Sequence, residues 1–97
     1  MSDVYDVIVK PIITEDSIKR LQEKKYTFEV ARDANKIEIS RAVAEIFGVK
    51  VKTVRTMNVR GRQKRVGRHV GFRSDWKKAI VTLTADSKGI EFFESLS

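Results

Sequence analysis

The sequence contains no cysteine, a single histidine and a single proline. The absence of cysteine excludes disulfide bonds, thiolate metal sites and a cysteine nucleophile, and it fits a reducing compartment. No apolar run approaches the roughly 20 residues of a membrane-spanning helix, and the opening residues MSDVYDVIVK lack a signal-peptide pattern. These absences predict a cytosolic protein.

Catalytic motifs are also missing. The sequence has no phosphate-binding loop of the GxxxxGKS or GxxxxGKT type, no HExxH motif and no nucleophile elbow. His69 has no evident partner for metal binding or proton transfer. The acidic pairs Glu15/Asp16 and Glu91/Glu94 fit the surfaces of helices better than a catalytic site. We therefore expect neither an enzyme nor a bound cofactor or metal ion.

What is present suffices for one small globular domain. A length of 97 residues is typical of a single domain. The hydrophobic fraction, 41%, is near the normal value, so general disorder is not expected. We expect one domain that spans residues 1–97.

The positive charge is concentrated in one segment. Residues 60–78 hold eight bases and one acid, Asp75, which accounts for the whole net charge of +7, and the remainder has 12 bases and 12 acids. Such a focus indicates a polyanion-binding site. The eight bases are Arg60, Arg62, Lys64, Arg65, Arg68, Arg73, Lys77 and Lys78.

The first part of the chain reads as strand, helix, strand. Residues 4–9, VYDVIV, are mostly β-branched or aromatic and are followed by Pro11, which predicts a strand or an extended arm. A short helix is expected over 14–23, with the first residue as its N-cap. Residues 26–30, YTFEV, alternate as in a half-buried strand, with Thr27 facing outward.

A second helix is the most clearly marked element. Asn35 and Glu38 have the spacing of a capping box. Apolar residues then recur at helical spacing over 36–47, and Gly48 is a natural stop.

The remaining segments predict a hairpin with a long basic tip. Residues 49–59 alternate with a change of phase near Thr53, which indicates a strand with a bulge. Residues 77–85 form another strand, and Gly89 opens a short amphipathic tail with one helical turn. The two strands flank 60–75. The expected fold is therefore α+β: a small sheet with an antiparallel hairpin packed on two helices, and a long basic hairpin loop extending from the domain.

The loop has the residue types that contact phosphates. Arg60, Arg62 and Lys64 alternate, so in extended backbone they recur about every 6.6 Å on one side. Arg outnumbers Lys five to one in residues 60–73. Arginine makes bidentate phosphate contacts and stacks on bases.

Aromatic residues in this segment have more than one interpretation. His69 and Phe72 suit stacking on unpaired bases, which RNA offers more than DNA. Trp76 fits either a hairpin anchor packed on the core or a stacking platform. The charged loop is also compatible with a solvated surface or with anionic lipid, but no apolar helical face accompanies its charges.

Several segments carry a resemblance to a known family, and the last of them is highly specific. They are 11–15 (PIITE), 35–39 (NKIEI), 47–49 (FGV), 57–61 (MNVRG) and 71–79 (GFRSDWKKA). In these segments, over almost the whole chain, the sequence resembles the bacterial form of the universal large-subunit ribosomal protein family numbered twenty-three.

The resemblance implies a structural, RNA-binding role. The domain would bind 23S ribosomal RNA early in assembly, and its hairpin would pass between RNA helices and line the polypeptide exit tunnel. Its exposed side would form part of the tunnel rim, where family members dock the chaperone trigger factor and the signal recognition particle. The neighbouring twenty-ninth large-subunit protein would pack alongside, and no homo-oligomer is expected.

The expected site residues combine both lines of reasoning. Glu15 matches the family's trigger-factor contact, although by position alone it is a helix-dipole acid. Asp16 departs from the Lys often found next. Lys36, at a helix N-terminus, is unfavourably placed unless it meets a phosphate. The expected RNA-binding residues are Lys36, Asn58, Arg60, Arg62, Lys64, Arg65, Arg68, His69, Phe72, Arg73, Trp76, Lys77 and Lys78.

Two other classes remain open from the residues alone. A free regulatory module would bind RNA or DNA with a sequence preference as an isolated domain. A peripheral membrane adaptor would bind anionic vesicles better than RNA at equal salt.

Overall fold

The computed structural model describes residues 4–59, 63–66, 69–72 and 75–94, and of residues 4–5, 63–66, 69–72 and 94 it describes the backbone only. The helices and strands are α1 (Val4–Val7), β1 (Ile8–Pro11), α2 (Glu15–Arg20) with a 3₁₀ turn (Leu21–Glu23), β2 (Lys25–Val30), α3 (Lys36–Phe47), β3 (Val51–Val59), β4 (Gln63–Val66), β5 (His69–Phe72), β6 (Trp76–Leu83) and α4 (Glu91–Glu94).

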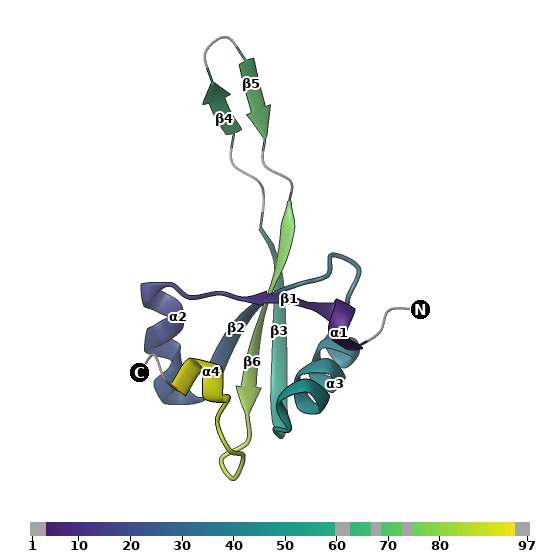
Figure 1. Ribbon diagram of the computed structural model, residues 1–97, viewed down its shortest axis with the longest axis vertical. Coiled ribbons are helices and arrows are strands. Elements are labelled where there is room, and N and C mark those ends of the chain that lie inside the picture. Colours follow the sequence, from purple (N-terminus) through teal and green to yellow (C-terminus); the bar gives the residue numbers. More distant parts are fainter. Residues whose placement is uncertain (1–3, 60–62, 67–68, 73–74, 95–97) are drawn as a thin grey trace.

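The main sheet has four antiparallel strands in the order β1-β2-β6-β3 (Figure 1). β3 and β6 form the expected antiparallel hairpin, and the α+β prediction is confirmed. Beyond their ends, β4 and β5 pair as a separate two-stranded sheet that extends away from the domain. The segment expected to be a loop, 60–75, therefore contains a paired β-ribbon.

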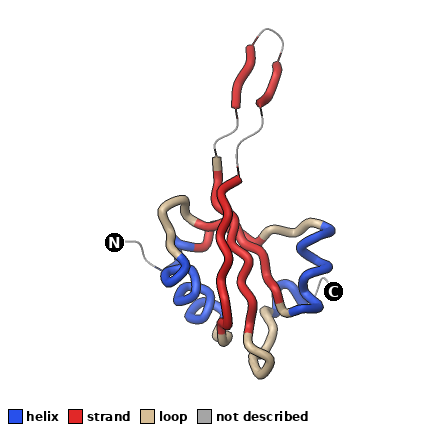
Figure 2. The backbone as a smooth tube through the Cα atoms, turned by 180° about the vertical axis from the view of Figure 1, so that it is seen from behind, coloured by secondary structure: helices blue, strands red, loops and turns tan. Residues whose placement is uncertain are grey.

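The core lies between the main sheet and the helices. Phe28 of β2 is fully buried, and its ring centroid lies 5.6 Å from that of Phe47 in α3 and 5.5 Å from that of Phe93 in α4. Burying a side chain of this size stabilises the fold by about 1.5–3 kcal/mol. In Figure 2, α1 and α3 flank the strands near the end marked N, and α2 and α4 flank them near the end marked C. Because Phe28 contacts both α3 and α4, these two helices pack on the same face of the sheet. No helix in the described part of the chain is long and apolar enough to cross a membrane.

Side-chain caps set where α2 and α3 begin. Thr14 and Ser17 exchange backbone-to-side-chain hydrogen bonds of 3.2 and 2.7 Å. Asn35 and Glu38 do the same at 2.8 and 3.2 Å. Gly48 ends α3 in the left-handed region, with φ of 64°, which glycine adopts without strain. These observations confirm both predicted helix starts and the predicted end of α3.

The N-terminal segment differs from the prediction. A strand over 4–9 is wrong for its first four residues, because Val4–Val7 forms the helical turn α1 and β1 begins only at Ile8. Val7 is only 3% exposed, so packing into the core overrides the strand preference of these residues. Pro11 is the last residue of β1. It is tolerated because β1 is an edge strand.

Thr27 faces away from the core, as the alternation of β2 predicts, and pairs with Ile80 across the sheet. It is nevertheless only 1% exposed, and its hydroxyl has no hydrogen-bond partner among the described residues. The helix expected over 14–23 tightens into a 3₁₀ turn after Arg20. The bulge predicted near Thr53 is confirmed, because the register of β3 against β6 shifts between Val51 and Thr53.

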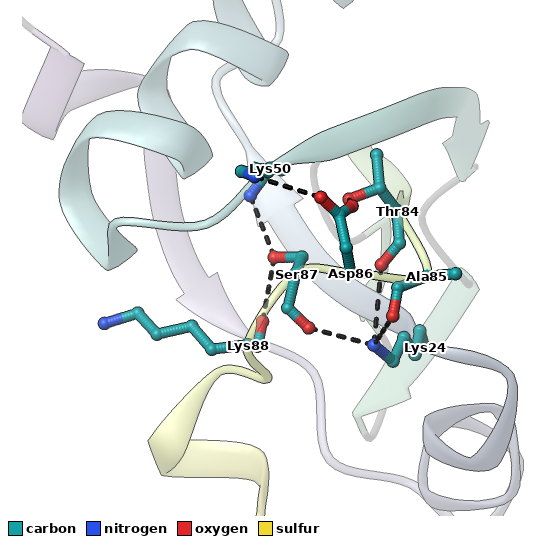
Figure 3. A network of polar contacts seen from close by, with 7 residues as sticks. All are labelled: Lys24, Lys50, Thr84, Ala85, Asp86, Ser87 and Lys88. Atoms are coloured by element: carbon teal, nitrogen blue, oxygen red, sulfur yellow. Dashed lines mark hydrogen bonds and ion pairs between the residues drawn. The ribbon is translucent and has the colours of Figure 1, made fainter.

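A polar network ties the turn before α4 to the rest of the domain (Figure 3). The Lys24 ammonium donates to the carbonyl oxygens of Ala85 and Ser87 at 2.8 and 2.9 Å. It also lies 3.5 Å from the Thr84 carbonyl oxygen. The Ser87 hydroxyl accepts from the Lys50 N–H at 2.9 Å. One charged group thus holds three carbonyls of a turn that has little regular structure of its own.

Asp86 completes the network on the solvent side. Its carboxylate accepts from the Thr84 hydroxyl at 2.6 Å and from the Lys50 ammonium at 3.0 Å. These two bonds, that of Thr84 first, hold the pKa of Asp86 below its usual value. The associated stabilisation is present above the carboxyl pKa of the unfolded chain and is lost as pH falls through the folded-state pKa.

Replacing Lys24 by Met retains the aliphatic stem and removes the ammonium. We expect the free energy of unfolding to fall by about 1–3 kcal/mol, because the carbonyls of the turn lose a charged donor. Denaturant unfolding measures the change. Lys24→Gly is the control: it also removes the ammonium, but it relieves a left-handed backbone with φ of 58°, so it should cost less. A Met variant as stable as the parent would contradict this role.

Candidate nucleic-acid interface

The β3–β6 ladder decides which side chains face solvent together. Paired residues of an antiparallel ladder share a face, and faces alternate along each strand. Ala79 and Val81 belong to the core, so positions 76, 78, 80 and 82 lie on the opposite side of the sheet. We call this side the outer face. Its pairs on the ladder are Val59 with Trp76, Met57 with Lys78, Arg55 with Ile80, and Thr53 with Thr82.

The two adjacent lysines predicted to bind RNA point to opposite sides of the sheet. Lys77 lies on the core side, and its ammonium donates to the Ala34 carbonyl oxygen at 2.5 Å, directly before the start of α3. Lys78 lies on the outer face and forms no ion pair with a described residue. An internal hydrogen bond competes with a phosphate for Lys77, so Lys78 is the better placed of the two for a ligand.

Two further predicted residues lie on the core side near the base of the hairpin. Asn58 is exposed and pairs with Lys77 across the ladder. Lys36 is the exposed first residue of α3, two positions after the carbonyl that Lys77 holds. The fold therefore gathers these three residues at one end of the domain. Trp76 is half-buried on the other side, beside Val59, and both interpretations of it stand as predictions.

The β4–β5 ribbon contains four of the predicted residues. Its register pairs Lys64 with Gly71, Arg65 with Val70, Val66 with His69, and Gln63 with Phe72. For these residues the backbone alone is described, and Arg60, Arg62, Arg68 and Arg73 lie outside the described residues. Their part in RNA binding stays a prediction.

Glu15 lies far along the chain from this region, in the first turn of α2. Its side chain is 86% exposed, and its carboxylate lies 3.6 Å from the Lys19 ammonium. Surface pairs of this kind contribute little to stability. The carboxylate is therefore accessible to a partner at small cost. Asp16 beside it is exposed too.

Arg55 is a candidate that the sequence reasoning missed. It is exposed on the outer face, on the rung next to that of Lys78. A signal for it exists in the sequence: no acid occurs from Ile46 to Ser74, a stretch that begins well before the basic loop. The positive region therefore extends beyond residues 60–78 into β3.

Elsewhere in the described domain, several surface lysines pair with acids. Lys10 pairs with Glu29 at 3.9 Å, Lys25 with Glu23 at 3.3 Å, and Lys50 with Asp86 at 3.0 Å. The described residues contain no group of three or more His, Cys, Asp or Glu side chains that could hold a metal ion.

Replacing Lys77 and replacing Lys78 should have different effects on the free energy of unfolding. Lys77→Met should lower the free energy of unfolding by about 1–3 kcal/mol, because the Ala34 carbonyl loses its charged donor. Lys78→Met, the matched control one residue away, should stay within about 0.5 kcal/mol of the parent. Denaturant unfolding of both variants tests this, and equal losses would argue against an internal role for Lys77.

Comparison with known proteins identifies the family. A family model described as "Ribosomal protein L23" matches residues 6–92. The "Large ribosomal subunit protein uL23" of Natranaerobius thermophilus is 58% identical over 92 residues, which cover 95% of this chain and 99% of the relative. The proteins of the same name from Clostridioides difficile and Caldanaerobacter subterraneus are 54% and 57% identical, and the matches cover 99% and 97% of this chain and 100% and 98% of the relatives. The chain belongs to the ribosomal protein L23 family.

Proposed function

We propose that the chain, a structural constituent of the large ribosomal subunit, binds 23S ribosomal RNA early in assembly and lines the polypeptide exit tunnel with its basic hairpin. The observation that carries the proposal is the location of charge: residues 60–78 hold the entire net charge of +7, and a neutral domain carries them. In the proposed complex, residues 1–97 form one RNA-binding domain with an extended loop at 60–75.

The physical basis is the release of counterions. A polyanion such as RNA gives up condensed cations when Lys and Arg neutralise its phosphates, and the gain in free energy grows with the number of phosphates neutralised. A two-stranded ribbon with its own paired backbone extends from the main sheet in Figure 1. Such a ribbon pairs part of its own backbone, so it reaches between RNA helices with fewer unpaired backbone groups than a single extended strand would leave.

The family is one of structural proteins, so the expectation that the chain is not an enzyme is confirmed. Membership in a ribosomal protein family also places it in the cytoplasm, on the ribosome. Neither conclusion depends on the absence of a motif.

We further propose that the side of the domain bearing α2 contributes to docking of trigger factor and of the signal recognition particle, with Glu15 as a contact. Support comes from the exposure of this carboxylate and from its position on a short capped helix, away from the basic ribbon in Figure 1. The large-subunit protein numbered twenty-nine is proposed to pack alongside.

The proposed function is distinguishable from the two open classes. A free regulatory module would sediment apart from ribosomes, and a membrane adaptor would prefer anionic vesicles to RNA at equal salt. Neither behaviour is expected.

Replacing Arg62, Lys64, Arg65 and Arg68 by Ala should weaken binding to a 23S ribosomal RNA transcript by several kcal/mol. The magnitude of the slope of log K against log salt should fall by up to about 4, roughly one for each phosphate that is no longer neutralised. A salt titration with an unrelated structured RNA as competitor measures both. The melting temperature should barely change, since these residues lie outside the core. An unchanged slope would show that the hairpin does not touch phosphates.

Glu15→Ala should weaken trigger-factor binding to ribosomes severalfold while subunit assembly proceeds normally. The matched control is Asp16→Ala, which removes an equal charge from the neighbouring exposed position. Binding of labelled trigger factor to purified ribosomes measures the effect. Parent-like affinity in the Glu15 variant would refute the contact.

A further inference from the structure

The outer face carries a row of polar and positive groups that the hairpin proposal does not use. From the base of the hairpin, its four rungs hold Trp76, then Lys78 with Met57, then Arg55, then a pair of threonines, Thr53 and Thr82. Arg55 and Lys78 occupy adjacent rungs on different strands, a diagonal relation that places them about 7–8 Å apart. The row follows the strands that continue toward the ribbon (Figure 2).

The charge of this row is not balanced locally. Glu29 of β2 lies directly across from Lys78 in the sheet, but its carboxylate lies 3.9 Å from the Lys10 ammonium, and Glu23 pairs with Lys25 at 3.3 Å. β3 and β6 contain no acid at all. Among the described residues, Arg55 and Lys78 have no ion-pair partner, so the outer face of these strands keeps two unpaired positive charges.

The apolar side chains of this face do not form a charge-free centre: Val59 and Trp76, both half-buried, lie at the hairpin end, and the middle of the face holds Arg55 and Lys78. Ile80 sits between Arg55 and Thr27 and is only 8% exposed, and Met57 is 37% exposed. The centre of a stable protein–protein interface is apolar and depleted of charge. Arginine, lysine and threonine hydroxyls are instead the groups that contact phosphate and sugar oxygens in nucleic-acid complexes.

We propose that the outer face of the β3–β6 ladder is a second RNA contact, which binds the sugar–phosphate backbone of ribosomal RNA. Arg55 forks onto one phosphate, Lys78 neutralises an adjacent one, and Thr53 and Thr82 donate from the far end of the row. This inference rests on the proposed function and extends it, because the contact then runs from the ribbon across the domain instead of ending at the hairpin.

The test uses the full chain with the substitutions Arg55→Gln and Lys78→Gln together. The probe is a 23S ribosomal RNA transcript, titrated at several salt concentrations. We expect affinity to fall on the order of tenfold, and the magnitude of the salt slope to fall by about 0.7–0.9 for each phosphate that is no longer neutralised. Melting temperatures establish that each variant is folded.

The matched control is Arg41→Gln with Lys88→Gln. Both residues are exposed, on α3 and on the turn before α4, and their replacement changes the net charge by the same amount. Parent-like slope in this control, with a reduced slope in the outer-face variant, supports the proposal. Equal losses in the two variants overturn it, because net charge alone would then explain the effect.

The hairpin variant separates this inference from the function on which it rests. A parent slope in the outer-face variant, with a reduced slope in the hairpin variant, overturns the outer-face contact and leaves the hairpin contact in place. If neither variant changes the slope, both fail. If only the outer-face variant changes it, the hairpin proposal fails and the outer-face contact stands.

Discussion

The antiparallel pairing of β3 with β6 is the constraint on which the rest of the structure depends. It places Ala79 and Val81 in the core, and by the same alternation it places Lys78 on the outer face. A slip of one residue would exchange the two sets. Core packing and the presentation of cations are therefore not independent, because one register determines both.

The division of charge also follows from this arrangement. A small domain cannot bury many unpaired cations, since each costs several kcal/mol unless it is compensated. In the described domain, Lys24 and Lys77 donate to carbonyl groups, and several other bases pair with acids. The excess charge is left to the hairpin and to β3, where RNA supplies the compensation in the proposed complex. In that complex, stability and RNA binding draw largely on different lysines and arginines.

Much of the fold was predictable from local signals, because these signals act over a few residues. The N-cap of α2 at Thr14, the capping box of α3, the stop at Gly48 and the bulge near Thr53 are of this kind. The helical turn at Val4–Val7 was not, since it depends on packing of Val7 against distant residues. The opposite orientations of Lys77 and Lys78 could not be predicted without the register of β3 against β6. The same register is what places Arg55 next to Lys78. The sequence therefore predicted the positive charge of this region, but not the face of the sheet on which each charged side chain lies.

The strand order has a consequence for how the protein is made. β6 lies between β2 and β3, yet it is the last strand to be synthesised. Until residue 83 exists, β2 and β3 share no partner, and the pairing of Val30 with Lys77 must close a loop of more than 40 residues. Contacts of such separation form slowly. Completion of the main sheet therefore waits for the last strand of the chain, although that strand occupies an inner position.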